Sequence, residues 1–464
     1  MSLVSTELNP ATAWEPFRPT TKKAWNLARA AHLYRRAAFG GSWKQLQQAV
    51  ADGPEATVDR LLTGEPDTAS FYIEARSMIA SLLGLGGADD LPAWWLYVMI
   101  HSPHPLREHA TLFWHGHFAT SAAKVTDRGL MLAQNELFRQ HALGNFGALL
   151  RSEAKDPAML LWLDSAVNRK GRANENFARE VMELFSLGVG NYTERDIKEA
   201  ARAFTGWEVH HNQFWINAAQ HDEGEKRVLG ERGAFDGDQI IDLLLRQPAA
   251  ARYIVRKLYR YFVADEFPES ASPAEVAAFL EPLAEELREH DYDVARVVRR
   301  MLTSNWFYAE GAMARRIKGP VEFAVGLVRS LEGHVDHYAL SRDLAQLGQR
   351  VFFPPNVKGW NGGREWINSY TLVSRTNLIG EMASGSDGRY GDKLGLAECP
   401  ALADCRDERS LVQRLIDLTL AVAPPADVVD ELERVAVRKA GESEARRRGR
   451  IVHALAALPE FQLA

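Results

Sequence analysis

Residues 25–39, WNLARAAHLYRRAAF, decide the fold class. Apolar residues recur there every three or four positions, which places them on one face of a helix: Leu27, Ala31, Tyr34 and Ala38. The helix is expected to end at Gly40. Similar periodicity recurs along most of the 464 residues. The sequence therefore predicts a mainly α protein, a large multi-helix globular bundle with a few short strands in irregular loop regions.

The chain is longer than the size at which one hydrophobic core usually stops growing. We expect an N-terminal extension (residues 1–24), a main helical domain that contains the functional site (25–383), and a linker with a C-terminal helical segment packed on that domain (384–464). Two irregular stretches, 207–230 and 352–368, interrupt the helical pattern, and the first is expected to contain short strands.

Composition excludes several classes of protein. The net charge of -6 and the pI near 6.2 argue against a nucleic-acid-binding protein. No apolar run is long enough for a membrane span, and residues 1–20 lack the basic start and apolar core of a secretory signal, so a cytoplasmic location is expected. Two cysteines, Cys399 and Cys405, are too few for a four-cysteine zinc site.

Several longer strings identify a family. They are AAHLYRRAAFG (30–40), LREHATLFWHGHFAT (106–120), NRKGRANENFAREVMELFSLGVG (168–190), YTERDIKEAARAFTGW (192–207), HDEGEKRVLG (221–230) and PPNVKGWNGGREWIN (354–368). Together they resemble the bacterial domain-of-unknown-function family 1800, whose activity is not established. The resemblance implies a sulfatase-like partner protein, because members are often encoded beside such a family. Many members begin with an export signal, which leaves location open.

Two pairs of residues are candidate metal ligands. The first is the HxH pair His115 and His117. In an extended chain both imidazoles would reach one ion, whereas on a helix they would diverge by about 200°. The second pair, His221 and Asp222, supplies the imidazole and carboxylate that zinc, manganese or iron accept. The alternatives are helix-end histidines bonded to backbone, and a turn in which Asp222 binds backbone and His221 is solvated.

A predicted helix near 174–187 supplies candidate catalytic residues. Glu180 and Glu183 would serve as acid/base groups, with Arg179 orienting carboxylates or an anionic substrate. His221 is a further candidate general base. The alternative is an exposed ladder of ion pairs at i,i+4 spacing.

The stretch 352–368 is expected to contact substrate through Lys358, Trp360, Arg364 and Trp366. Trp and Arg together suit stacking on a sugar ring and gripping a phosphate or carboxylate. The alternative is a rigid loop whose tryptophans cover a core.

The sequence lacks GxSxG, GxxxxGK[ST] and HExxH motifs, which counts against serine hydrolases, P-loop NTPases and zincins. Our leading hypothesis is a metal-assisted hydrolase or acid/base enzyme for a carbohydrate-like or anionic (phospho or sulfo) substrate. The alternative is a non-catalytic binding or assembly partner of the sulfatase-like neighbour. A di-iron protein is a weaker third, because the required Glu-x-x-His spacing occurs only at 208–211.

Overall fold

The computed structural model describes residues 9–84, 86–384, 389–390 and 394–464, and these contain 22 α-helices. The mainly α fold is confirmed. The helices of the first half of the chain are α1 (Pro10–Ala13), α2 (Leu27–Ala37), α3 (Trp43–Asp52), α4 (Pro54–Thr63), α5 (Thr68–Leu83), α6 (Asp90–His101), α7 (Pro105–His117), α8 (Arg128–His141), α9 (Phe146–Ala154), α10 (Pro157–Trp162), α11 (Glu175–Glu180) and α12 (Glu194–Ala203).

The helices of the second half are α13 (Gly237–Arg246), α14 (Pro248–Phe262), α15 (Pro273–Glu289), α16 (Val294–Thr303), α17 (Pro320–Ser330), α18 (His337–Gln346), α19 (Ser369–Ala383), α20 (Glu408–Thr419), α21 (Ala426–Ala436) and α22 (Glu444–Ala456). A π-helical turn, η2 (Val181–Ser186), continues α11. The segment 207–233 forms two antiparallel hairpins, β1 (Trp207–His210) with β2 (Gln213–Ile216), and β3 (Lys226–Val228) with β4 (Glu231–Gly233).

Many of the helices begin at a residue whose side chain caps the first turn. Asn26 caps α2 by accepting a hydrogen bond from the backbone of Arg29. Thr193 and Asp196 form the expected capping box of α12. Helix α2 differs from the expectation in one respect, because its polar residues Arg35 and Arg36 are buried as well as its apolar face. It lies in the interior against α3, α7 and α20.

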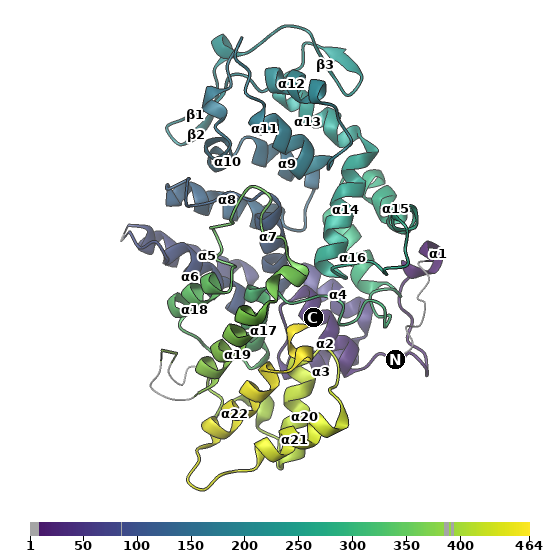
Figure 1. The fold of residues 1–464 in the computed structure, drawn as a ribbon, viewed down its shortest axis with the longest axis vertical. Helices are drawn as coiled ribbons and strands as arrows, with labels where there is room; N and C mark the ends of the chain where they lie inside the picture. Colours follow the sequence, from purple (N-terminus) through teal and green to yellow (C-terminus); the bar gives the residue numbers. More distant parts are fainter. Residues whose placement is uncertain (1–8, 85, 385–388, 391–393) are drawn as a thin grey trace.

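Buried apolar side chains form one connected core from Ala13 to Phe461. In Figure 1, α9–α13 and the hairpins occupy the top of the molecule, α7 and α14 the middle, and α19–α22 the bottom. The described part of the N-terminal extension is tied down by Trp14, whose indole donates to the Phe279 carbonyl of α15 at 2.7 Å. The linker expected at the start of 384–464 falls largely outside the described residues.

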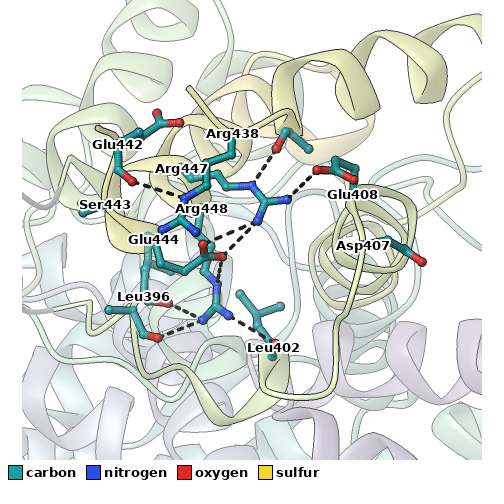
Figure 2. A network of polar contacts seen from close by, with 12 residues as sticks. Leu396, Leu402, Asp407, Glu408, Arg438, Glu442, Ser443, Glu444, Arg447 and Arg448 are labelled. Carbon is teal, nitrogen blue, oxygen red and sulfur yellow. Dashed lines mark hydrogen bonds and ion pairs between the residues drawn. The ribbon is translucent and has the colours of Figure 1, made fainter. Parts of the chain in front are cut away.

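The C-terminal helices are joined to one another by arginines of α22 (Figure 2). Arg448 donates to the carbonyls of Leu396 at 2.7 Å and Leu402 at 3.4 Å, and Arg447 lies 3.3 Å from the Glu408 carboxylate. Helix α22 packs on α19, and α20 packs on α2 and α17. Among the described helices, none is long and apolar enough to cross a membrane.

Candidate functional site

A cavity of about 220 Å³ lies where α7, α14 and the loop 349–366 meet. Its wall contains four cationic residues, two carboxylates, one histidine and two tryptophans: Lys257, Arg260, Arg316, Lys358, Asp265, Glu322, His117, Trp360 and Trp366. Four of the residues named from the sequence, His117, Lys358, Trp360 and Trp366, therefore line one space.

The HxH pair lies on the last turn of α7, so the extended geometry that a shared ion needs does not occur. His117 lines the cavity. Its Nε2 lies 3.1 Å from the Phe185 carbonyl, to which it donates, and its Nδ1 accepts a hydrogen bond of 2.8 Å from Lys257. Burial and the Lys257 ammonium hold the pKa of His117 well below its usual value. His117 is therefore a neutral imidazole with both nitrogens engaged.

His115 is not among the residues that line the cavity, and it anchors the loop. Its Nε2 accepts a hydrogen bond of 2.9 Å from the backbone N–H of Phe352, a residue held at φ 66°. Its ring packs against Trp95, Phe352 and Trp360. Burial lowers the pKa of His115 to about 3. The imidazole thus acts as a neutral acceptor that holds the start of the loop on α7.

Lys257 is the residue that sequence reasoning missed. Its ammonium donates to His117, and the ring of Tyr253 lies 5.3 Å away. Among the described residues, no carboxylate comes within 4 Å of it, which is unusual for a lysine that is largely withdrawn from water. Burial, and then Arg260, lowers the pKa of Lys257 to about 8. At neutral pH a part of this side chain is the free amine.

The two carboxylates of the cavity wall have other partners. Glu322 binds the Arg316 guanidinium at 2.6 Å, the His109 imidazole at 2.8 Å and the backbone N–H of Gly319 at 2.9 Å. Burial alone would raise the pKa of Glu322, but Arg316 and His109 outweigh it and hold the pKa well below its usual value. The Asp265 carboxylate accepts a hydrogen bond of 2.8 Å from the backbone N–H of Ile317. Among the described residues, both carboxylates form their ion pairs with Arg316, and neither forms one with Lys257, Arg260 or Lys358.

The loop 349–366 reaches the helix because of a glycine. Gly359 has φ 76°, and a Cβ there would lie 2.2 Å from the Gly116 carbonyl oxygen. Only glycine allows this approach, which brings Lys358 and Trp360 to the cavity. Trp360 and Trp366 are half-buried. Arg364, the fourth residue predicted to contact substrate, does not line the cavity, and its exposed guanidinium lies 3.4 Å from Glu266.

The three candidate catalytic residues of the helix near 174–187, Glu180, Glu183 and Arg179, have different surroundings. Glu180 is half-buried, has no hydrogen bond or ion pair to another described residue, and interacts electrostatically with Lys358 of the cavity. Burial and the neighbouring Glu183 raise the pKa of Glu180. Glu183 accepts a hydrogen bond of 2.6 Å from Tyr192. Arg179 pairs with Glu175 at 3.2 Å, an i,i+4 pair of the kind that the ion-ladder alternative describes. It also pairs with Glu194, fifteen residues further along the chain, at 2.8 Å.

His221 and Asp222 lie elsewhere, just before β3 at the top of Figure 1. His221 Nδ1 lies 2.9 Å from the Thr205 carbonyl. Asp222 accepts from Arg202 at 2.8 Å and from the backbone N–H of Gly224 at 2.9 Å. The Arg202 hydrogen bond lowers the pKa of Asp222 to about 2. This geometry corresponds to the turn alternative for Asp222.

The side chains named as metal ligands, His115, His117, His221 and Asp222, thus do not form one site. Across the described ranges, no three His, Cys, Asp or Glu side chains stand close enough to hold an ion. Lys257 and Phe352 already use the lone pairs of His117 Nδ1 and His115 Nε2. The donor set therefore does not fit a zinc, manganese or iron centre shared by these residues.

No curated protein and no solved structure matches the chain. A family model described as "Protein of unknown function (DUF1800)" matches residues 32–463. Since this match covers nearly the whole chain, the protein belongs to the DUF1800 family.

Proposed function

We propose that this protein is an acid/base enzyme that acts on an anionic, carbohydrate-like molecule in the cavity between α7 and α14, with Lys257 and His117 as its reactive pair. One observation carries the proposal: a lysine without a carboxylate partner among the described residues donates to a neutral histidine at the wall of a cavity lined by two tryptophans. Perturbed lysines in clefts are favoured positions for proton transfer.

The charge of the wall favours an anion. Arg316 compensates Glu322, and Asp265 is the other carboxylate of the wall, so Lys257, Arg260 and Lys358 leave an excess of positive charge. A phosphate, sulfate or carboxylate group would supply the missing negative charge. Trp360 and Trp366 offer apolar faces for a ring. The volume of about 220 Å³ suits a mono- or disaccharide unit rather than a large cofactor.

The residues suit transfer of a proton in either direction. As a free amine, Lys257 takes a proton from substrate or water, while one of its N–H groups stays bonded to His117 Nδ1. As an ammonium it returns the proton to a departing oxygen. Glu180, whose raised pKa and position near Lys358 make it a proton donor at the mouth, is our candidate for the second acid/base group.

The test is a turnover screen with phosphorylated, sulfated and carboxylated sugars, each beside its neutral parent. We expect anionic sugars alone to be consumed, and Lys257→Met to lower kcat at least about 100-fold with an unchanged Tm. Lys44→Met, at an exposed position outside the cavity, is the matched control. Full turnover by Lys257→Met, or consumption of the neutral parents alone, would refute the proposal.

A second candidate is assembly with a sulfatase-like partner protein. One observation favours it: α19, which follows the cavity loop directly, exposes Tyr370 (62%) and Val373 (61%). Replacing both by serine should abolish co-purification with such a partner and leave the Tm unchanged. Lys257→Met separates the two candidates, because it should affect turnover and spare the complex.

A further inference from the structure

A second, much smaller cavity lies among α2, α17, α20 and the turn Pro459–Gln462. Its volume is about 10 Å³, the room of a single water molecule or monatomic ion. Every residue of its wall is buried. Two of them are cations, Arg35 and Lys318, and most of the others are apolar, including Phe39, Phe323 and Phe461.

Arg35 is a buried cation whose hydrogen bonds are incomplete. It is 5% exposed, and its Nε and Nη1 atoms have no hydrogen-bond partner among the described residues. No carboxylate of the described chain lies within 4 Å of its guanidinium; Asp417 acts on it only at longer range. A buried donor without a hydrogen-bond partner destabilises the folded state, and a charged donor does so more strongly. A fold that retains this arginine needs an acceptor beside it.

Lys318 meets Arg35 across the cavity. It is 6% exposed, and its ammonium donates to the carbonyls of Phe461 at 2.9 Å and Thr419 at 3.4 Å, which leaves one N–H for the cavity. Burial lowers the pKa of Lys318 to about 7, and the positive charge of Arg35 adds a smaller contribution in the same direction. Two basic side chains therefore adjoin one apolar cavity, and the described residues provide no ion pair for either.

We propose that this cavity binds one chloride-class monatomic anion between Arg35 and Lys318. Such an ion accepts a hydrogen bond from one of the unpartnered N–H groups of Arg35 and one from the remaining Lys318 N–H. It compensates the positive charge of Arg35 and stabilises the ammonium form of Lys318. A water molecule would also accept some of these hydrogen bonds, but it carries no negative charge. The missing charge matters because electrostatic interactions are strongest in a buried site of low dielectric constant. Phosphate and sulfate are too large for the space. The bound ion would contact residues of α2, α17 and the C-terminal turn and so stabilise their packing.

The experiment is thermal unfolding of the full chain in sodium chloride and in sodium gluconate at equal ionic strength. We expect chloride to raise the Tm by roughly 2 °C, since an ion bound only by the folded state stabilises it. Arg35→Met and Lys318→Met should lose this difference. Lys44→Met, which removes the same charge from an exposed position, should keep it.

Bromide-soaked crystals of the wild-type protein provide the second measurement, which does not depend on the variants folding. An anomalous peak between Arg35 and Lys318 is expected. A cavity that holds only water, or a chloride response as large in Arg35→Met as in the wild type, would overturn the proposal. Neither outcome bears on the Lys257 cavity, so the two proposals fail separately.

Discussion

A buried pair of carboxyl groups makes the stability of this protein depend on pH. Glu153 of α9 and Asp156, the N-cap of α10, are 1% and 7% exposed and both accept a hydrogen bond from Gln134 Nε2 at 2.8 Å. Burial raises the pKa of Asp156 to about 7. Burial and the neighbouring Asp156 raise the pKa of Glu153 well above its usual value. We expect Asp156→Asn to stabilise the protein at alkaline pH.

The size of the effect follows from the two states. An unfolded aspartate titrates near pH 3.9, so between about pH 4 and 7 the folded chain holds a proton that the unfolded chain has lost. Stability is therefore highest below this window and falls as pH rises through 7. At about 1.4 kcal/mol per pKa unit, ionisation of Asp156 costs at most about 4 kcal/mol at pH 8. Asparagine removes this cost and keeps the N-cap acceptor.

The assay is urea unfolding at pH 5 and pH 8. We expect Asp156→Asn to gain about 1–3 kcal/mol over the wild type at pH 8, and clearly less at pH 5. Asp293→Asn is the matched control, because Asp293 is also a helix N-cap, on α16, and is exposed. A variant as pH-dependent as the wild type, or one destabilised equally at both pH values, would show that this carboxyl pair does not titrate as the geometry indicates.

Three further predictions concern the candidate site. His115→Ala should lower the free energy of unfolding by about 1–3 kcal/mol and make Trp360 more accessible to quenching by acrylamide. Plasma mass spectrometry should show no loss of bound metal, and a metal lost with His115 would contradict the anchoring role. Glu322→Gln should lower the free energy of unfolding, measured by urea titration, by about 3–5 kcal/mol, because it leaves Arg316 buried and poorly paired. A change below about 1 kcal/mol would show that Glu322 does not stabilise the buried Arg316. Gly359→Ala should weaken the binding of anionic sugars and change the Tm little, because the added Cβ displaces the loop from the Gly116 carbonyl. An unchanged affinity by calorimetry would show that this close contact does not position the loop for binding.

Local rules predicted most of the fold. Apolar periodicity placed α2, because this signal acts over a few residues. The capping box that starts α12 is equally local, since Thr193 and Asp196 are three residues apart. The spacing of His115 and His117 was compatible with both an extended chain and a helix, and only the structure distinguishes the two. Cys399 and Cys405 are free thiols.

The candidate site was predicted only in part, because its walls come from distant segments. His117 and Lys257 are 140 residues apart, and no local spacing encodes their contact. One signal was present: Lys257 lies four residues from both Tyr253 and Tyr261, so it occupies the aromatic face of α14. A lysine on such a face indicates a buried amine.

The most direct test of the account is the pH at which Lys257 becomes reactive. Limiting acetic anhydride at a series of pH values, read out by peptide mass spectrometry, measures the free-amine fraction of each lysine in the folded protein. We expect Lys257 to be half-reactive near pH 8, well below the value of about 10.4 for an ordinary lysine, and to be protected by an anionic sugar. Reactivity that appears only near pH 10, or that no anion suppresses, would contradict the assignment of this cavity as the functional site.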